Sequence, residues 1–456
     1  MRITVVGCGY VGLVTATGLA ARGHHVTGVD VSSERIAEVN SGKAPFFEPG
    51  LDDMLKDALQ SGSFIATTEF GSVSRSQVIL FCVGTPSGSD GSIDLTWLKQ
   101  AVSSAVEHLK ESDFYQVVAI RSTVVSGTAQ NVVWPLLEPL LSTRKASLGL
   151  VSNPEFLREG SAAAEFFQPD RIIVGEKDYS SGDLFSQVYA GFNAPIMRMN
   201  LQTAEMVKYT SNTLWATLVS FSNEIARICE TLPGVDAERV LEGVRVDRRI
   251  SPFVDGKRVV AEVGSYLRAG CGYGGSCLPK DLRALIQFAR ARGVRPMLLE
   301  AVDEVNVTQA SHFIGLAEGA LGDLKSKRSL VLGVSFKTGT DDIRESPGVR
   351  LIRQLMSKGA DVYAYDPLVT KSQIDVLSKE GVRFVEEPRS AAMDMDVCFV
   401  TTLAPDFAFL EEMPASLGKV LRGPLIVDGR GALRHVAISR CDRYVGIGLG
   451  PTLKFN

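Results

Sequence analysis

Apolar and polar positions along the first 200 residues alternate between two patterns. Short runs rich in Val, Ile and Leu, such as residues 2–7, 24–30 and 76–84, have the length and composition of buried strands. Between them lie segments with helical spacing of apolar positions, such as residues 13–23. Further strand-like runs lie at residues 115–123, 147–154 and 170–176. Strands that alternate with helices predict a parallel sheet with crossover helices, the doubly wound α/β fold.

A different pattern begins at Leu201. Residues 201–232 repeat apolar positions with helical spacing and contain no proline or glycine, which predicts one long helix. Helical patterns follow around residues 282–294 and 297–321. Near Lys325 the strand pattern returns, in the order strand, loop, helix, glycine, strand and Asp seen at the amino end. We therefore predict two Rossmann-like doubly wound domains joined by a long central helix and a helical middle domain. The predicted boundaries are 1–200, 201–322 and 323–456.

Charge and composition narrow the classes of function. The net charge is −4 and the sequence pI is near 5.9, so overall charge favours neither nucleic acid nor an anionic membrane. No apolar run approaches the roughly 20 residues of a membrane span, and the amino end begins with a strand pattern rather than a signal peptide. The seven cysteines are scattered without metal-ligand spacing. We expect a cytoplasmic protein with reduced thiols and no metal site.

A dinucleotide fingerprint follows the first predicted strand. Gly7, Gly9 and Gly12 form G-x-G-x-x-G where a helix begins, which permits a tight turn and a close approach of the backbone to a pyrophosphate. Asp30 ends the second predicted strand, where its carboxylate can accept hydrogen bonds from ribose hydroxyls and would repel a 2′-phosphate. These features favour NAD over NADP and indicate hydride transfer. The alternative is a glycine-rich turn without a ligand.

A second glycine-rich segment, residues 272–281, carries a thiol. Cys277 lies near Lys280, whose ammonium favours the thiolate, and one helical turn before Asp281 if a helix begins at Leu278. A thiolate that adds to an aldehyde gives a thiohemiacetal, which can lose a second hydride to become a thioester that water converts to an acid. The pattern indicates oxidation of an alcohol to a carboxylate, and an inert cysteine on a loop is the alternative.

Other polar residues have spacings that suit a substrate site. Lys208 and Asn212 share one face of the long predicted helix and could stabilise an oxyanion, although a solvated helix face is the alternative. Glu155 follows a predicted strand in NPEFLREG and suits proton transfer or water activation. Lys337 and Arg344, in the loop of the second doubly wound domain, suit the phosphates of a second ligand or are surface cations.

These motifs, in this order, resemble the UDP-glucose/GDP-mannose dehydrogenase family over nearly the whole chain. The resemblance rests on GCGYVG, VGTPS, RSTV, NPEFLREG, EMVKYTSN, AGCGYGGSCLPKD, FKTGTDDIRESP, YDP and DGR. It implies oxidation of the C6 alcohol of a nucleotide sugar to a carboxylate with two NAD, through a thiohemiacetal and a thioester on cysteine. It also implies that the first domain binds NAD, that the third binds the nucleotide sugar, and that the long helix builds a homodimer.

The resemblance also implies roles for individual residues. In catalysis it implies Cys277 as nucleophile, Lys208 and Asn212 as the oxyanion and water-positioning pair, Asp281 as their assistant, Glu155 as acid/base group and Thr123 in placing water. The implied cofactor contacts are Gly7, Gly9, Tyr10, Val11, Gly12, Asp30, Arg35, Thr85, Thr123, Glu159, Lys280 and Arg344. The implied substrate contacts are Glu155, Phe156, Leu157, Arg158, Glu159, Lys208, Asn212, Arg249, Tyr266, Leu267, Arg268, Ala269, Gly270, Gly274, Lys337 and Arg430.

The sequence leaves the nucleotide sugar open. PDRIIVG and DGR resemble UDP-glucose enzymes, whereas SCLPKD and FKTGTDDIRESP also occur in GDP-mannose enzymes. We favour UDP-glucose, with GDP-mannose or another nucleotide hexose as the alternative. An arginine of the partner chain, Arg249 here, is expected at the active site, although residues 250–264 are longer than the family pattern. A two-electron hydroxyacid dehydrogenase and a non-catalytic NAD-binding sensor are the remaining alternatives.

Overall fold

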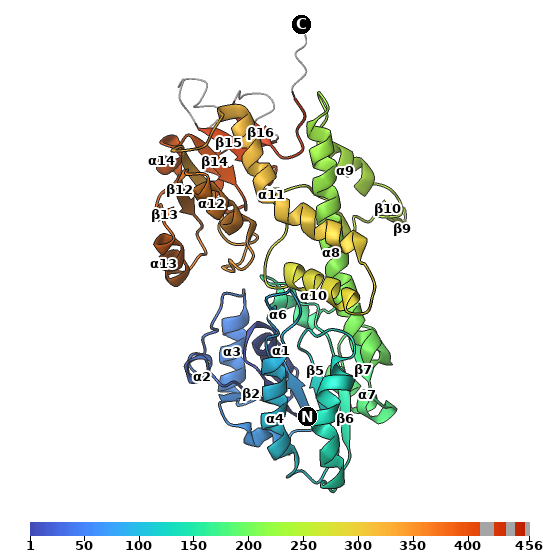
Figure 1. Cartoon of the computed structure of the whole chain (residues 1–456). Coiled ribbons are helices and arrows are strands. Elements are labelled where there is room, and N and C mark those ends of the chain that lie inside the picture. Colours follow the sequence, from blue (N-terminus) through green and yellow to red (C-terminus); the bar gives the residue numbers. More distant parts are fainter. Residues whose placement is uncertain (411–423, 435–442, 452–456) are drawn as a thin grey trace. The chain divides into compact units, whose positions relative to one another are not determined.

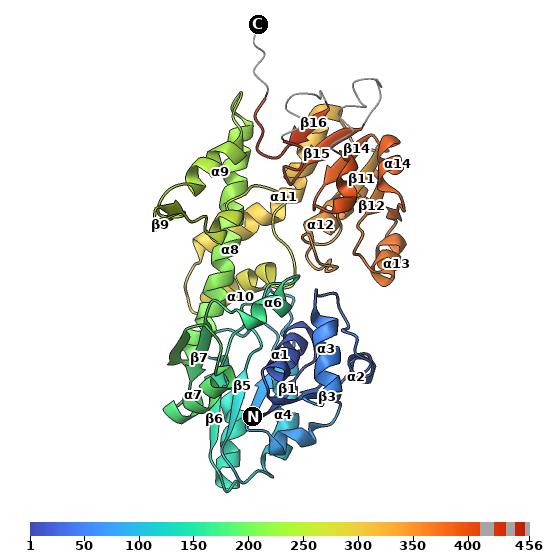
Figure 2. The same ribbon diagram turned by 180° about the vertical axis from the view of Figure 1, so that it is seen from behind.

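The computed structural model describes residues 1–410, 424–434 and 443–451, and Figures 1 and 2 show it from two sides. The chain divides into two compact units, Met1–Ser211 with Gln287–Gly293 and Asn212–Ile286 with Val294–Asn456. The division falls within two helices, α8 (Leu201–Glu230) and α10 (Leu278–Arg290). Two Rossmann-like sheets and a helical middle confirm the predicted fold class, whereas the three domain boundaries stay a prediction.

The first unit is built on an eight-stranded sheet with the order β3-β2-β1-β4-β5-β6-β7-β8. Its strands are β1 (Arg2–Val6), β2 (His25–Val29), β3 (Phe64–Thr67), β4 (Val78–Phe81), β5 (Gln116–Ile120), β6 (Leu148–Ser152), β7 (Ile172–Glu176) and β8 (Ile196–Asn200). Alternate residues of β4 enter different apolar clusters: Val78 and Leu80 join one, and Ile79 and Phe81 join the other. A strand buried on both faces has no polar side, which explains its continuous apolar run.

One strand pair differs from the predicted parallel sheet. β6 and β7 run antiparallel, whereas the other pairs of this sheet are parallel. The connection between them holds only the short helix α6 (Ala162–Phe167). The side chain of Asn153, the first residue of this connection, donates through Nδ2 to the carbonyl oxygen of Ile173 on β7 (2.8 Å). The chain therefore turns back at the carboxyl end of β6, and antiparallel neighbours need no crossover.

The remaining elements of the first unit are helical. The α-helices are α1 (Tyr10–Ala21), α2 (Ser33–Asn40), α3 (Leu51–Gln60), α4 (Thr96–Leu109), α5 (Trp134–Leu137) and α7 (Tyr179–Ser186). Short helical turns are η1 (Phe70–Arg75), η2 (Ala129–Val133), η3 (Glu138–Ser142) and η4 (Gln187–Tyr189). Residues of α1, α3 and α6 pack in the cluster that holds Leu80, and residues of α4 and α5 pack in the cluster that holds Phe81. Helices therefore supply both apolar layers that bury the sheet.

The second unit contains a six-stranded parallel sheet with the order β13-β12-β11-β14-β15-β16. Its strands are β11 (Arg328–Leu332), β12 (Asp361–Tyr365), β13 (Arg383–Phe384), β14 (Val397–Val400), β15 (Leu425–Asp428) and β16 (Tyr444–Gly446). The order repeats that of the first six strands of the first sheet, with the first strand beside the fourth. This arrangement places a switch point beside the carboxyl end of β11, where open α/β sheets bind ligands.

Helices and one hairpin complete the second unit. They are α9 (Ala237–Arg245), α11 (Met297–Leu321), α12 (Pro347–Ser357), α13 (Lys371–Lys379), α14 (Pro388–Met393), η5 (Glu262–Ser265), η6 (Pro405–Phe407) and the hairpin of β9 (Phe253–Val254) and β10 (Lys257–Arg258). The long helix α8 ends two residues before its predicted end, because Pro233 and Gly234 follow closely. Helix α10 begins earlier than its apolar pattern indicated, since Pro279 lies in the first turn, where proline is tolerated.

Candidate active site

The glycine-rich turn between β1 and α1 has the geometry of a phosphate-binding turn. Gly7 has a φ of 98°, and a Cβ there would lie 2.9 Å from the carbonyl oxygen of Cys82. A Cβ on Gly12 would lie 1.7 Å from the carbonyl oxygen of Gly7, so glycine is required for α1 to begin here. In the described part of the chain, no heavy atom lies within 4 Å of a Cβ built on Gly9, which precedes α1. This open position at a helix N-terminus fits a dinucleotide pyrophosphate.

Asp30 lies directly after β2 and is buried. Its Oδ2 accepts hydrogen bonds from the backbone N–H of Cys8 (2.8 Å) and from Nη1 of Arg35 (2.9 Å). Its Oδ1 accepts one from the N–H of Ser32 (3.0 Å). The carboxylate is thus fixed at the strand end with acceptor capacity left for a ribose hydroxyl. Arg35, a predicted cofactor contact, is brought to the same place by this ion pair.

Tyr10 and Val11 begin α1, and Tyr10 links the fingerprint to the NPEFLREG loop. The Tyr10 hydroxyl donates to the carboxylate of Glu48, which also accepts the backbone N–H of Gly160 (2.7 Å). Burial, the hydrogen bond to Glu48 and the charge of Glu159 raise the pKa of Tyr10, so the phenol stays a donor. Sequence reasoning missed Glu48, because a single glutamate in a loop gives no signal of a buried acceptor.

Lys208 and Glu155 form a buried ion pair. Nζ of Lys208 lies 2.9 Å from Oε1 of Glu155, and both side chains are only 5% exposed. Oε2 of Glu155 accepts the backbone N–H of Leu157 (2.7 Å). Burial alone would raise the pKa of Glu155, but the charges of Lys208 and Arg121 and these hydrogen bonds hold it below its ordinary value. The alternative that Lys208 lies on a solvated helix face is therefore wrong.

Two other residues of the NPEFLREG loop, Phe156 and Arg158, contact charged side chains. The ring of Phe156 has Nζ of Lys208 at 5.5 Å and Cζ of Arg171 at 4.0 Å from its centroid. Arg158 pairs with Glu165 through its Nε (2.6 Å), at the start of α6. The aromatic face adds to the electrostatic field that holds the Lys208 ammonium. Leu157 contributes the backbone donor to Glu155, so contacts within the loop add to those that it makes with other segments.

Arg121 is a buried residue that sequence reasoning passed over, although it stands in the RSTV motif. Its Nη1 donates to Oδ1 of Asn153 (2.6 Å) and to the hydroxyl of Tyr189 (3.0 Å). Its Nε donates to Oγ1 of Thr15 on α1 (3.1 Å). A cation at the end of the apolar strand β5 was the available signal. Arg121 ties three elements together and supplies positive charge near Glu155.

Thr85 and Thr123 follow β4 and β5 and are brought into contact. Oγ1 of Thr85 donates to the backbone carbonyl of Thr123 (2.7 Å), which fixes the two strand-end loops to each other. Ser122 adds a hydrogen bond from its Oγ to the carbonyl of Val83 (2.7 Å). The two threonines therefore occupy equivalent strand ends, at the edge where open α/β sheets bind ligands.

In the second unit, Cys277 directly precedes α10. Its carbonyl oxygen accepts the N–H of Asp281 (2.9 Å), so the thiol stands at the N-terminal end of the helix. Of the six cysteines among the described residues, Cys277 is the one that is not buried; Cys441 lies outside these residues. Burial raises the pKa of Cys82 to about 12 and that of Cys271 to about 11, which makes those thiols inert. A helix N-terminus favours a thiolate.

Asp281 is fully buried and has two partners. Nδ2 of Asn212 donates to its Oδ2 (2.6 Å), and Nζ of Lys280 lies 2.5 Å from its Oδ1. The structure thus brings Asn212, Lys280 and Asp281 together, one helical turn from Cys277. Asn212 lies one turn after Lys208 on α8. The buried carboxylate is compensated by an ammonium and an amide, as burial of charge requires.

The predicted substrate segment 266–270 contacts the turn that carries Arg430. The ring of Tyr266 stacks on that of Trp215 (centroids 4.9 Å apart), and Arg245 donates to the carbonyl of Leu267 (2.8 Å). A Cβ on Gly270 would lie 2.9 Å from the carbonyl oxygen of Gly429, and Nε of Arg430 donates to the carbonyl of Thr401 (2.6 Å). Arg268 is largely exposed, with Nε 3.8 Å from Oε1 of Glu238. Ala269 packs on the core of this unit.

The loop between β11 and α12 carries the predicted phosphate-binding cations. Arg344 is paired with Asp342 (2.8 Å between Nη2 and Oδ2), and its side chain is largely exposed. Nζ of Lys337 lies 5.6 Å from the centroid of the Phe336 ring. Gly274 of the cysteine loop abuts this segment, because a Cβ on it would lie 2.4 Å from the carbonyl oxygen of Glu345. The loop therefore offers cations at a strand end beside the cysteine loop.

Arg249 lies apart from these groups. Its side chain is 89% exposed and pairs with Asp247 (2.8 Å). The segment 250–264 that follows contains the β9–β10 hairpin, on which Arg258 lies over the ring of Phe253 (4.7 Å to its centroid). Residues 253–258 of this segment thus pair as a hairpin, and the role of Arg249 toward a partner chain stays a prediction.

Two further expectations concern membranes and metals. Within the described ranges, the helices are too short or too polar to cross a membrane. The same residues contain no group of three or more His, Cys, Asp or Glu side chains that could hold a metal ion.

Comparison with known proteins identifies the family. The chain matches three family models of the UDP-glucose/GDP-mannose dehydrogenase family: the NAD binding domain over residues 1–193, the central domain over 202–308 and the UDP binding domain over 330–435. The match to the first model, together with the glycine turn, establishes NAD as the cofactor. The match to the third indicates a nucleotide-sugar substrate.

Relatives that are named for different nucleotide sugars match most of the chain. A UDP-glucose 6-dehydrogenase of Bacillus subtilis is 36% identical over 94% of this chain and 89% of its own. A GDP-mannose 6-dehydrogenase of Pseudomonas putida is 40% identical over 84% of each. The solved UDP-glucose dehydrogenase of Pyrobaculum islandicum superimposes with a TM-score of 0.86, at 34% identity and 98% coverage of both chains. The chain therefore belongs to the UDP-glucose/GDP-mannose dehydrogenase family of NAD-dependent nucleotide-sugar 6-dehydrogenases.

Proposed function

We propose that the protein oxidises the C6 alcohol of UDP-glucose to the carboxylate of UDP-glucuronate, with the sugar carbon held on Cys277 between two oxidations. The observation that carries this proposal is the thiol. Cys277 is the one described cysteine that is not buried, and it stands at the start of α10 beside the buried Asn212–Asp281 pair. An oxidation that stops at a ketone needs no nucleophile, whereas passage through an aldehyde does.

Two molecules of NAD, bound one after the other, would each accept one hydride. The alcohol first loses a hydride and a proton to become an aldehyde, and the Cys277 thiolate adds to the aldehyde carbon. Loss of a second hydride from this thiohemiacetal gives a thioester, and water cleaves it, returning the thiol and releasing the acid. One alcohol and one water thus give one carboxylate, two hydrides and three protons. Gly7, Gly9 and Asp30 are the residues that would hold the cofactor.

The polar residues supply charge where the intermediates develop it. Lys208 and Asn212 lie one turn apart on α8 and donate to the oxyanion of the thiohemiacetal. Glu155, whose lowered pKa keeps it ionised, accepts a proton from the water that attacks the thioester, and Thr123 helps to place that water. Asp281 holds the amide of Asn212 in place. Burial of Lys208 and Glu155 strengthens these interactions, because the local dielectric is low.

The nucleotide and sugar assignments rest on two observations. The third matched family domain is described as UDP binding, and a UDP-glucose relative covers most of the chain. Lys337 and Arg344 are proposed to bind the phosphates, and residues 266–270 with Arg430 the sugar end. GDP-mannose is the second candidate, because a relative that is 40% identical acts on it. Other nucleotide hexoses are variants of the same proposal.

We further propose a cytoplasmic homodimer built on α8. Leu214, Phe221 and Ile228 are each about half exposed and are spaced by seven residues, so they form one apolar stripe along this helix. A heptad stripe of this kind is typical of a helix that packs against another helix. Arg249 is the residue proposed to reach the partner's active site. Light scattering should give twice the chain mass for the wild type and a smaller mass for Phe221→Glu.

The test is NADH formation with a panel of UDP-glucose, GDP-mannose and UDP-N-acetylmannosamine. We expect turnover with UDP-glucose and two NADH for each acid released. Faster turnover of GDP-mannose would replace the sugar assignment and retain the chemistry. A plateau at one NADH with a ketone product would favour a two-electron dehydrogenase. No turnover with any nucleotide hexose would favour a non-catalytic NAD-binding sensor.

A further inference from the structure

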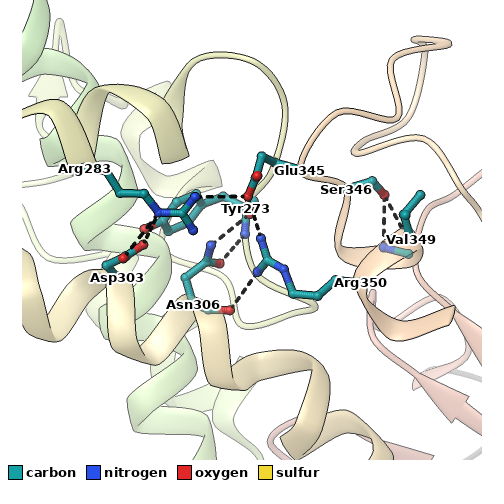
Figure 3. A network of polar contacts seen from close by, with 9 residues as sticks. Tyr273, Arg283, Asp303, Asn306, Glu345, Ser346, Val349 and Arg350 are labelled. Carbon is teal, nitrogen blue, oxygen red and sulfur yellow. Dashed lines mark hydrogen bonds and ion pairs between the residues drawn. The ribbon is translucent and has the colours of Figure 1, made fainter. Parts of the chain in front are cut away.

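The loop that carries Cys277 is pressed against α11. Gly272 has a φ of 91°, and a Cβ on it would lie 2.4 Å from Oδ1 of Asn306. The next residue, Tyr273, donates its backbone N–H to the same Oδ1 (2.8 Å), while Nδ2 of Asn306 donates back to its carbonyl (3.1 Å). Figure 3 shows this double contact. The first half of the cysteine loop is therefore fixed by one buried amide.

The second half of the loop is pressed against the segment between β11 and α12. The N–H of Gly275 donates to the carbonyl oxygen of Arg344 (2.9 Å). A Cβ on Gly275 would lie 2.8 Å from the ring of Phe336, and one on Gly274 would lie 2.4 Å from the carbonyl oxygen of Glu345. These glycines therefore bring the backbone close to the loop that carries the predicted phosphate-binding cations.

Glu345 is the residue at which these contacts converge. It has a φ of 51° and is one of three non-glycine residues with positive φ in the described ranges, a conformation that needs support from its surroundings. Its Oε2 lies 3.3 Å from Nη1 of Arg283 and 3.2 Å from Nη2 of Arg350 (Figure 3). Arg283 also contacts Asp303 on α11 (3.3 Å). Two arginines thus hold one carboxylate.

The two arginines come from elements with different tasks. Arg283 belongs to α10, the helix that begins directly after Cys277. Arg350 belongs to α12, the helix that follows the phosphate loop, and its Nη1 donates to the backbone carbonyl of Asn306 (3.1 Å). Glu345 is therefore the point where the helix of the thiol, the helix α11 and the nucleotide-binding segment are joined within one unit.

We propose that Glu345 is a positioning residue for Cys277, which acts by holding the loop of residues 333–347 against the cysteine loop. Through this link, a nucleotide held by the cations of that loop fixes the place of the thiol. Loss of the link loosens the thiol loop and lowers kcat more than it weakens nucleotide binding. The role in turnover rests on the proposed function, whereas the link between the two loops does not.

The test uses three variants of the full-length protein. Glu345→Gln removes the charge and keeps an acceptor. Glu345→Gly removes both but accepts the positive φ, so that its effect comes from the lost carboxylate rather than from backbone strain. Glu380→Gln is the matched control, because Glu380 forms a bidentate pair with Arg353 on the same helix α12 at the surface. The readout is the rate at which iodoacetamide modifies Cys277, followed by mass spectrometry of its peptide.

We expect Cys277 to be alkylated at least threefold faster in Glu345→Gly, with a smaller increase in Glu345→Gln and none in Glu380→Gln. With the sugar that the wild type oxidises, kcat should fall at least tenfold while KM changes less than threefold. Equal alkylation rates in all four folded proteins would overturn the proposal. Absence of NADH formation by the wild type would instead contradict the proposed function. The alkylation rates would still show whether Glu345 holds the two loops together.

Discussion

The turn from β1 into α1 and the turn from β11 into α12 share a hydrogen-bonding frame but differ in length. In the first, the N–H of Gly7 donates to the carbonyl of Val29 (2.7 Å), and that of Cys8 donates to the carboxylate of Asp30 (2.8 Å). Gly12, in the first turn of the helix, lies against the Gly7 carbonyl. The backbone thus forms the whole turn, which suits close approach of a pyrophosphate.

The second turn repeats this frame around an insertion. The N–H of Gly333 donates to the carbonyl of Tyr365 (2.8 Å), and that of Val334 donates to the carboxylate of Asp366 (2.8 Å). A Cβ on Gly348 would lie 2.4 Å from the carbonyl oxygen of Gly333, as for the first turn. The hydrogen-bonding frame of a dinucleotide fold is therefore present in both sheets, although the turn after β11 lacks the G-x-G-x-x-G sequence.

The insertion changes what the second turn can bind. Between Val334 and Pro347 it adds side chains that include Lys337 and Arg344, and it makes the contacts of Glu345 with Arg283 and Arg350. A backbone turn binds phosphate through N–H groups, whereas a longer loop binds it through side-chain cations. We propose that this frame serves NAD in the first unit and a nucleotide sugar in the second, where the UDP binding family model matches residues 330–435.

The largest effect is expected from breaking a lysine–carboxylate pair, and the two units allow a comparison: Lys208–Glu155 in the first and Lys280–Asp281 in the second. Replacing Lys208 with Ala should lower kcat about 100-fold and destabilise the fold by about 3–5 kcal/mol, because Glu155 would stay buried without its partner. Replacing Lys280 with Ala should cost less stability, since Asp281 keeps the amide of Asn212. Steady-state kinetics and urea unfolding measure both.

A double variant separates the two effects of Lys208. Lys208→Met combined with Glu155→Gln removes the whole pair, so stability should largely return while activity stays low. Near-normal kcat in folded Lys208→Ala would show that the ammonium does not stabilise an oxyanion.

The next largest effect is expected from replacing glycines of the two turns with alanine. Gly12→Ala should destabilise the first unit by about 3 kcal/mol, and Gly348→Ala should cost about 1–2 kcal/mol, since the steric overlap is smaller. Gly9→Ala is the control: it should unfold like the wild type but bind NAD more weakly, because the space beside it is where the pyrophosphate fits. Denaturant unfolding and NAD titration measure these changes. Equal tolerance of Ala at all three positions would refute the shared frame.

Asp30 after β2 and Asp366 after β12 should differ in their effect on the preference for NAD over NADP. Replacing Asp30 with Ser should narrow the preference for NAD over NADP by about 1–3 kcal/mol, since it removes a charge that accepts from ribose and repels a 2′-phosphate. Replacing Asp366 with Ser should leave the preference unchanged, because Asp366 belongs to the second sheet and lies outside the NAD binding domain of residues 1–193. Steady-state kinetics with NAD and with NADP measure this preference. An unchanged ratio of the two activities in Asp30→Ser would exclude a role of Asp30 in cofactor choice.

The smallest expected effect concerns the ionisation of Glu205, a buried carboxylate whose partners differ from those of Asp281. Asp281 has an ammonium partner, whereas Glu205 accepts the backbone N–H groups of Gly127 (2.5 Å) and Ala129 (2.8 Å). Burial raises the pKa of Glu205 to about 7, despite these hydrogen bonds. Because the folded state holds this proton more tightly than the unfolded state, stability is present below pH 4.5 and is lost as pH rises to about 7.

The pH dependence of melting temperature isolates this group. The Tm of the wild type relative to that of Glu205→Gln should fall by a few degrees between pH 5 and pH 8. Parallel curves for the two proteins would mean that Glu205 is ionised throughout this range.

Much of the fold follows from the sequence, because its signals are local. Continuous apolar runs predict strands buried on both faces, and a long stretch without proline or glycine predicts α8. The antiparallel pairing of β7 is not local, since residues 153–171 separate it from its partner strand β6. The strands β3 and β8 were missed because they are short and partly polar. Such edge strands carry little hydrophobic pattern.

The residues of the candidate site also fall into two groups, those with a local signal in the sequence and those without one. Residues inside motifs, such as Cys277 and Asp281, could be found from spacing, and the helix start at Leu278 brings them one turn apart. Residues that act through tertiary contacts, such as Glu48, Arg121 and Glu345, could not, because their partners are distant in sequence. The burial of Lys208 belongs to this second group, since helical spacing does not show what covers a helix face.

The role of Cys277 is tested by counting NADH against the acid formed from a limiting amount of UDP-glucose. The wild type should give two NADH for each acid, because the aldehyde is held on the thiol and oxidised again. Cys277→Ser should still bind NAD, since the dinucleotide turn lies elsewhere in the chain, but it should release no acid. One NADH for each substrate in the wild type, or acid formation at an unchanged rate by Cys277→Ser, would contradict the thioester route.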